Sequence, residues 1–220
     1  MKVVCVIPAY NEEHNILQVI RDVKPLVNEI VVVDDNSTDN TKNILRGEGV
    51  ILLHHIINRG QGAALETGDK YAIDNGADIV IHFDADGQFN ANDIKKLVEP
   101  IINDDYEIVL GSRMLGDRKA IPPIKRFFIF PLAHLANYVF WKARLTDPQC
   151  GLRAIKKDAL TKIIIEQDKM AHTSEIIGKI FSNNLKYKEV PVNVIYKEFG
   201  QSFSGGFKIL KDLVLAKFIN

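Results

Sequence analysis

The chain has 220 residues, of which 46% are hydrophobic and 25% are charged, a balance that suits one larger globular domain. Lys plus Arg and Asp plus Glu number 28 each, so the zero net charge argues against a protein built to coat nucleic acid. The two cysteines, Cys5 and Cys150, form no CxxC pair, which argues against a disulfide framework or a zinc site and fits a reducing cytosol.

Apolar, β-branched runs alternate with segments of helical periodicity through the first half of the chain. Strands are expected at residues 3–7, 30–33, 50–53, 79–83 and 108–111, and helices at 11–23, 38–45, 60–75 and 91–102. This alternation predicts βαβ units, and therefore an α/β fold with a mostly parallel sheet. Polar clusters follow three of the strands, at residues 8–12, 34–39 and 84–88. Because ligands bind outside the carboxyl ends of such strands, the three clusters should meet in one crevice.

The pattern changes after about residue 115. Residues 124–141 are very apolar, and residues 146–153 predict a loop that enters a strand or a turn. Helices are expected at 158–165, 174–182 and 206–219, and a strand at 190–196, where Pro191 favours an edge position. The apolar stretch and the amphipathic segment 206–219 are too short to span a bilayer, so we expect them to lie on a membrane surface. Packing of residues 124–141 into the domain core or a homodimer contact is the alternative.

Asp84 and Asp86 flank Ala85 directly after a buried strand. Two neighbouring carboxylates repel each other, and partial burial raises the free energy of their ionised forms further. Magnesium or manganese relieves both, since these ions accept one or two carboxylates together with substrate phosphates. A solvated Asp-Ala-Asp-Gly turn is the alternative, and the position after a βαβ strand favours the metal site.

Two further segments could contact a nucleotide. Asp34 and Asp35 could accept a hydrogen bond from a base N–H, or could cap the following helix. Arg59 lies in the glycine-rich segment 58–62, which could hold phosphate or could simply begin a helix. The histidines have no metal-ligand spacing and are interpreted as packing or surface residues, and no motif of a nucleophilic hydrolase is present.

Taken together, residues 7–13 (IPAYNEE), 33–39 (VDDNSTD) and 84–88 (DADGQ) resemble, in order and spacing, family 2 glycosyltransferases with the GT-A fold. Residues 111–113 (GSR) and 147–153 (DPQCGLR) resemble the dolichol-phosphate mannose synthase and polyprenyl-phosphate glycosyltransferase branch. The likeness extends over about residues 1–205.

The resemblance implies roles for individual residues. The nucleoside pocket would be lined by Pro8, Tyr10, Glu12, Val33 and Asp35. Ala85 and Gln88 would lie beside the donor, while Asp84 and Asp86 would hold the metal and, through it, the diphosphate. Arg113 would contact the lipid phosphate, helped by Arg126.

Two positions bear on substrates without deciding them. Residues 196–203 read YKEFGQSF where the branch often carries Tyr-Arg-x-x-Gly-x-Ser-Lys, so Lys197 offers the diphosphate no bidentate fork. Glu175 stands near the start of a predicted helix, either as a contact to acceptor or donor sugar or as an acidic residue favoured at a helix N-terminus.

These observations predict one GT-A domain, with residues 1–115 binding the nucleotide sugar and residues 116–220 forming the acceptor side with its interface helices. The expected reaction is a metal-dependent, inverting transfer of one sugar from a UDP- or GDP-sugar to a polyprenyl (dolichyl or undecaprenyl) phosphate. A sugar hydroxyl acceptor and a nucleotide-sugar-binding module without turnover are the alternatives. We expect a cytoplasmic protein bound peripherally to the cytoplasmic face of the membrane, with a homo-oligomer or a membrane-protein partner left open.

Overall fold

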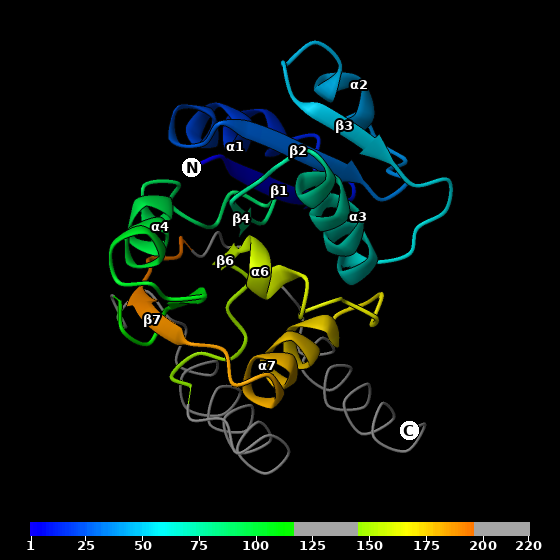
Figure 1. Ribbon diagram of the computed structural model, residues 1–220. Coiled ribbons are helices and arrows are strands. Elements are labelled where there is room, and N and C mark those ends of the chain that lie inside the picture. The colour runs from blue at the N-terminus through cyan, green and yellow to red at the C-terminus, as the bar shows by residue number, and fades with distance from the viewer. Residues whose placement is uncertain (117–144, 196–220) are drawn as a thin grey trace.

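In the computed structural model, which describes residues 1–116 and 145–195, seven strands form one sheet in the order β3-β2-β1-β4-β6-β5-β7. The strands are β1 (Val3–Ala9), β2 (Glu29–Asp34), β3 (Ile51–His54), β4 (Ile79–His82), β5 (Ile108–Ser112), β6 (Arg153–Lys156) and β7 (Tyr187–Pro191). Figure 1 shows β3 and β7 at opposite margins of this sheet. All neighbours pair in parallel except β6, which runs antiparallel to both β4 and β5.

Helices cover both faces of the sheet. The helices are α1 (Ile16–Val23), α2 (Thr41–Leu45), α3 (Gln61–Asp74), α4 (Asp93–Asn103), α6 (Lys157–Leu160) and α7 (His172–Ser182), with a 3-10 turn at Lys24–Leu26. Alternate strand residues enter two hydrophobic clusters, as a period of two requires. Cys5 and Ile7 join the cluster that contains α1 and α4, whereas Val4 and Val6 join the cluster that contains α3 and α7. The buried strands therefore have no solvent-facing side, and only their ends are available for chemistry.

Most expected elements are present, with four corrections. The helix expected at 38–45 begins only at Thr41, after Asn40. The helix expected at 11–23 begins only at Ile16, because the preceding residues hydrogen-bond to the loop after β2. The helix expected at 158–165 ends at Leu160. The final strand lies at the sheet edge as predicted, but it runs from Tyr187 to Pro191 rather than over 190–196.

The apolar stretch 124–141 and the segment 206–219 lie outside the described residues. Within the described ranges, no helix has the length and apolar character needed to cross a membrane.

Candidate active site

The loops after β1 and β2 are joined at the carboxyl ends of their strands. The Asn11 amide donates to Ser37 Oγ at 2.9 Å, and the Thr38 amide donates to Asn11 Oδ1 at 2.8 Å. The Glu12 amide donates to Thr41 Oγ1 at 2.8 Å. Asn11 adopts a φ of 57°, a left-handed conformation that asparagine tolerates better than most residues. Two of the three predicted polar clusters therefore lie together, as expected.

The residues predicted to line the nucleoside pocket differ in accessibility. Tyr10 is 47% exposed at the carboxyl end of β1, and Pro8 and Glu12 are partly buried. Val33 is fully buried and packs in the α3-side core, where its side chain lies close to Gly68. Only its backbone is thus placed to line a pocket.

Asp35 organises the loop between β3 and α3. Its Oδ1 accepts the Arg59 amide at 2.9 Å and contacts His55 Nδ1 at 2.7 Å, while Oδ2 accepts the Gly60 amide at 2.6 Å. Neither Asp35 nor Asp34 caps α2, whose first turn follows Asn40. The buried Asp34 instead contacts His54 Nδ1 at 2.8 Å. Three histidines that the sequence left without acidic partners thus have one each, the third being His82 with Asp69 at 2.8 Å.

Asp84 and Asp86 follow β4 and are partly buried. Asp84 Oδ1 accepts the side-chain amide of Gln61 at 2.8 Å, and Asp86 Oδ1 accepts the Gln88 amide at 2.9 Å. Burial, and secondly the charge of Asp86, raise the pKa of Asp84 to about 6. An ionised Asp84 is therefore unfavourable in the metal-free protein, and a divalent cation would stabilise it.

The donor set also bears on which metal could fit. Among the residues that the structure describes, no group of three or more His, Cys, Asp or Glu side chains is arranged to hold a metal ion. A site with two carboxylates suits a hard cation that takes its other ligands from water and phosphate, as magnesium and manganese do.

Arg113 forms a bidentate ion pair with the buried Asp147. The distances are 2.6 Å from Nε to Oδ2 and 2.7 Å from Nη2 to Oδ1. Glu189 of β7 holds the same loop by accepting the amides of Thr146 and Asp147. The motif GSR and the motif DPQCGLR are therefore one structural unit, and the predicted contact of Arg113 with lipid phosphate would add to this ion pair.

Arg59 and Glu175 both contact the segment between α6 and α7. Arg59 Nη2 lies 3.1 Å from Asp168 Oδ1, in a pair that is about half exposed on each side. Glu175 accepts the amides of Glu166 and Gln167 and pairs with Lys179 at 2.7 Å. Phosphate binding by Arg59 and a substrate contact by Glu175 stay predictions.

The remaining predicted residues divide between the site and its surroundings. Ala85 is buried in the α1-side core, whereas Gln88 is partly buried and its carbonyl accepts the Ile195 amide at 2.9 Å. Lys197 and Arg126 lie outside the described residues. Two residues to which the sequence analysis gave no role lie close to Asp84. Gln61, in the glycine-rich segment 58–62, donates to Asp84, and Arg153, the last residue of DPQCGLR, donates to the carbonyl of Gly151, whose backbone lies against Asp84.

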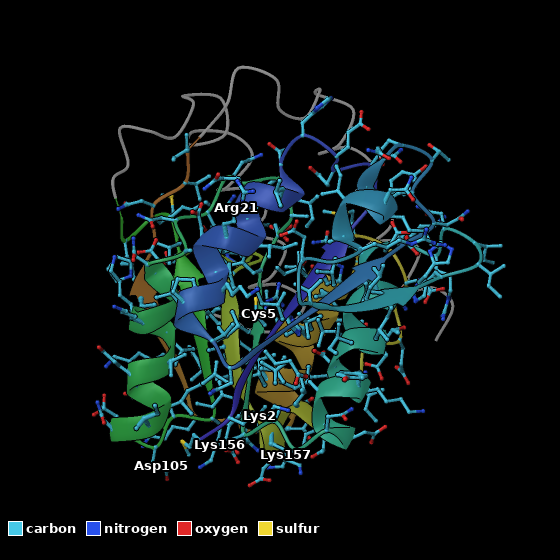
Figure 2. All side chains as sticks on the ribbon, turned by 90° about the horizontal axis from the view of Figure 1, so that it is seen from above. Lys2, Cys5, Arg21, Asp105, Lys156 and Lys157 are labelled. Atoms are coloured by element: carbon cyan, nitrogen blue, oxygen red, sulfur yellow. The ribbon has the colours of Figure 1, made fainter. Side chains whose placement is uncertain are left out.

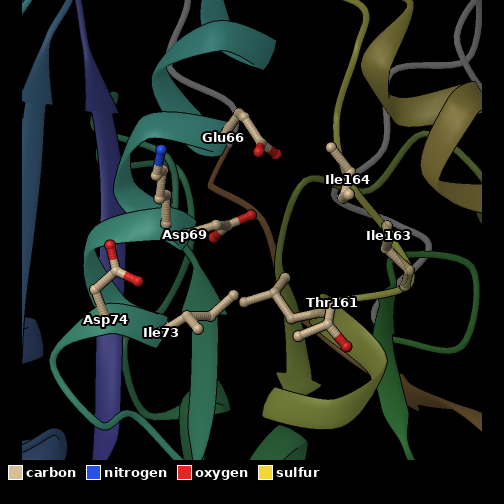
Figure 3. Close-up of a pocket in the computed structure, with 9 residues that line it drawn as sticks. Glu66, Asp69, Ile73, Asp74, Thr161, Ile163 and Ile164 are labelled. Carbon is tan, nitrogen blue, oxygen red and sulfur yellow. The ribbon is translucent and has the colours of Figure 1, made fainter.

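A hollow of about 200 Å³ lies between α3 and the residues that follow α6. Figure 3 shows Glu66, Asp69 and Ile73 from α3 facing Thr161, Ile163 and Ile164. None of the predicted site residues lines this hollow. The candidate site is therefore at the strand ends, not in this hollow.

Comparisons with known proteins show which sequences and structures this chain resembles. The chain is 36% identical over 96% of its length to UDP-N-acetylglucosamine–dolichyl-phosphate N-acetylglucosaminyltransferase of Methanococcus voltae, covering 94% of that protein. It is 29% identical over 94% of its length to undecaprenyl-phosphate mannosyltransferase of Micrococcus luteus, covering 89% of that protein.

Among solved structures, glucosyl-3-phosphoglycerate synthase from Mycobacterium tuberculosis, in complex with Mn²⁺, UDP and phosphoglyceric acid, superposes with a TM-score of 0.75. The identity is 18%, and the match covers 97% of this chain and 76% of that one. The expected GT-A α/β fold is thereby confirmed. A sequence profile described as Glycosyl transferase family 2 matches residues 4–164, and the chain therefore belongs to this family of glycosyltransferases.

Proposed function

We propose that this glycosyltransferase moves one sugar from a UDP- or GDP-sugar to a polyprenyl phosphate, with inversion at the anomeric carbon. The observation that carries the proposal is the Asp84–Asp86 pair at the end of β4, in a chain similar over nearly its whole length to transferases named for dolichyl and undecaprenyl phosphate. Residues 1–115 bind the nucleotide sugar, and residues 116–220 form the acceptor side. Tyr10, Pro8, Glu12, Asp35 and the backbone of Val33 contact the nucleoside.

Asp84 and Asp86 hold Mg²⁺ or Mn²⁺ in this proposal. When bound, such an ion acts as a Lewis acid that neutralises the charge of the leaving diphosphate and orients it. Arg59 and Lys197 contribute further positive charge to the diphosphate, and Ala85 and Gln88 lie beside the sugar. The Mn²⁺ and Mg²⁺ complexes of structural neighbours with UDP support a divalent ion in this fold.

A phosphate acceptor also fits the position of Glu175. A phosphate oxygen is already ionised at neutral pH, so its attack on the sugar needs no general base, whereas a hydroxyl needs one. Glu175 is occupied by two backbone amides and a lysine, which is the environment of a structural carboxylate. We assign the acceptor phosphate to Arg113, with Arg126 as a second cation.

A polyprenyl phosphate resides in a bilayer, so the enzyme must reach the membrane surface. We propose peripheral attachment at the cytoplasmic face, through residues 124–141 and 206–219. A second copy of the chain or a membrane protein could share this attachment.

The test is a donor screen with the purified protein and undecaprenyl or dolichyl phosphate. UDP- and GDP-linked glucose, N-acetylglucosamine and mannose are offered with Mn²⁺, with Mg²⁺ or with EDTA. We expect one donor to yield a polyprenyl-phosphate sugar in the presence of metal and none with EDTA. Transfer only to sugar hydroxyls, or binding of the donor without any product, would overturn the proposal.

A further inference from the structure

The carboxylate of Asp84 is contacted from two directions by parts of the chain that are far apart in sequence. On one side, the side-chain amide of Gln61, the first residue of α3, donates to Oδ1 at 2.8 Å. On the other side lies the backbone of Gly151, where an added Cβ would come within 2.7 Å of Oδ2 and 3.2 Å of Oδ1. Only glycine permits this approach, so the side chain of Asp84 has little room to change its orientation.

Arg153 fixes the Gly151 side of this arrangement. Its Nε donates to the Gly151 carbonyl at 3.1 Å, and its Nη2 donates to the Cys150 carbonyl at 3.3 Å. The side chain is fully buried, and the charges of Asp84 and Asp69 offset part of the desolvation of its guanidinium. Arg153 therefore also favours the ionised form of Asp84 by its charge. Its hydrogen bonds hold the Cys150–Gly151 backbone against Asp84.

The segment between α6 and α7 holds the start of α3, where Gln61 lies. The Asp168 carbonyl accepts the Ala63 amide at 3.1 Å, in the first turn of α3. Gly62 allows the Gln167 backbone to approach, since an added Cβ would overlap its carbonyl oxygen. Residues 166 and 167 are in turn held by Glu175 through their amides. The start of α3, and with it Gln61, therefore has a defined position relative to β4.

We propose that Gln61 and Arg153 are positioning residues that hold Asp84 in the orientation that binds the divalent cation, Gln61 directly and Arg153 through Gly151. The inference rests on the proposed metal-dependent function and names the residues that prepare its metal site. Groups that orient a metal ligand commonly change metal affinity by about 10- to 100-fold when they are removed.

The first experiment measures Mn²⁺ binding by calorimetry, with the full chain premixed with UDP or GDP. Gln61→Ala should weaken Mn²⁺ binding about 10-fold or more, while nucleotide binding in EDTA and the thermal midpoint stay close to wild type. Gln18→Ala is the matched control, because Gln18 is an exposed glutamine on α1 whose amide contacts only Asp22. Unchanged Mn²⁺ affinity in a folded Gln61→Ala protein would overturn the role of Gln61.

The second experiment tests the role of Arg153. Arg153→Met should weaken Mn²⁺ binding in the same assay, and Arg153→Lys should recover little, because lysine cannot reach two carbonyls with a planar fork. Lys156→Met is the control, because it removes a cation from the same strand. Figure 2 shows Lys156 near Asp105, and Lys156 pairs with Ile79 at the start of β4, whereas Asp84 follows the end of β4.

If Arg153→Met does not fold, Gly151→Ala tests the same contact between Gly151 and Asp84. The added methyl would displace the Asp84 carboxylate, so Mn²⁺ affinity should fall about 10-fold or more. Wild-type affinity in a folded Gly151→Ala protein would overturn this side. A wild-type protein that binds no Mn²⁺ with either nucleotide would instead refute the metal in the proposed function, a result distinct from equal binding by wild type and variants.

Discussion

Asp84 illustrates how a site residue can oppose folding. Burial and the neighbouring Asp86 raise its pKa from 3.8 to about 6, so the native state holds this proton more tightly than the unfolded chain does. The free energy of unfolding of the metal-free protein therefore falls as the pH rises from about 4 to about 6, through the ionisation of this group. A full shift of this size corresponds to about 3 kcal/mol, and partial exposure reduces the effect to about 1–2 kcal/mol.

We therefore expect Asp84→Asn to stabilise the metal-free protein at neutral pH relative to wild type by about 1–2 kcal/mol, and to abolish turnover. The stabilisation should shrink toward about pH 4, where wild-type Asp84 is itself neutral. Urea denaturation in EDTA at several pH values measures the difference, with Asp74→Asn at the exposed end of α3 as the control. A variant that keeps turnover, or a stability difference independent of pH, would contradict this account.

Asp35 connects the end of β2 to the loop that leads into α3. Asp35→Ala would leave the Arg59 and Gly60 amides and His55 without their acceptor, which should lower the free energy of unfolding by about 1–3 kcal/mol. We also expect a higher KM for the donor with a smaller change in kcat, because a base contact is similar in ground and transition states. Denaturation and steady-state kinetics on Asp35→Ala and on the exposed Asp22→Ala separate the two effects; unaltered donor KM would leave Asp35 a purely structural residue.

At the scale of elements, α7 holds the segment that follows α6 through Glu175. Glu175→Gln keeps an oxygen acceptor for the backbone amides, so with a phosphate acceptor it should retain most activity. Removal of a general base would instead reduce the rate about 10²- to 10⁴-fold. Initial rates with polyprenyl phosphate decide between the two, with Glu99→Gln on the exposed face of α4 as control. Near-complete inactivation with a native circular dichroism spectrum would favour a hydroxyl acceptor.

The edge strand β7 supports, through Glu189, the loop at residues 146–147, which we propose to lie on the acceptor side. This carboxylate accepts the Thr146 and Asp147 amides and the Thr146 hydroxyl, next to the Arg113–Asp147 ion pair. Glu189→Ala should lower the free energy of unfolding by about 1–3 kcal/mol and raise the KM for the acceptor more than that for the donor. Lys188→Ala, which alters the neighbouring side chain that pairs with Asp104, should leave the acceptor KM unchanged. A Glu189→Ala protein with wild-type acceptor KM would disconnect β7 from acceptor binding.

The sequence predicted the parallel strands β1 to β4 well because each is a short, largely apolar run, and three of them have a polar cluster after them. It predicted that residues 146–153 form a loop entering a strand or a turn, and β6 does begin at Arg153. It could not show that β6 lies antiparallel between β4 and β5, because the choice of pairing partner leaves no periodicity in the sequence. The helix expected at 158–165 ends at Leu160. Ile163 and Ile165 are nevertheless buried, and they belong to an irregular segment that follows the helix.

Residues of the candidate site can be predicted from the sequence where they form a short motif, but not where their position depends on tertiary contacts. Asp84 and Asp86 can be recognised in the sequence because two carboxylates directly follow an apolar strand. Gln61 and Arg153 lie inside segments that the sequence analysis quoted, 58–62 and 147–153, but their relation to Asp84 appears only when α3 and β6 are placed beside β4. The glycines at 60 and 62 were interpreted as a phosphate loop or a helix entry, and the structure shows that both lie against residues 167–168.

At the scale of the whole molecule, the described sheet places the functional residues along one edge. The loops after β1 and β2 meet there, and Gln61, at the start of α3, donates to Asp84 in the loop after β4. At the opposite end of the sheet lie ion pairs such as that of Lys156, the last residue of the antiparallel strand β6, with Asp105. This polarity leaves one side of the molecule for substrates, and a lipid acceptor requires that the same side can approach a bilayer.

Membrane attachment is the prediction that involves the whole chain. Residues 124–141 and 206–219 lie outside the described part of the chain, so their sequence carries it: an apolar stretch behind Lys125 and Arg126, and an amphipathic pattern with three lysines. Cations near an anionic surface contribute about 1 kcal/mol each, and salt screens them. We expect sedimentation with phosphatidylglycerol vesicles at low salt and less at high salt. Phe127→Glu combined with Phe128→Glu should release the protein and reduce activity on long-chain acceptors more than on short, water-soluble analogues. A protein that ignores the vesicles at low salt yet glycosylates a soluble acceptor well would refute the membrane interface and favour a hydroxyl acceptor.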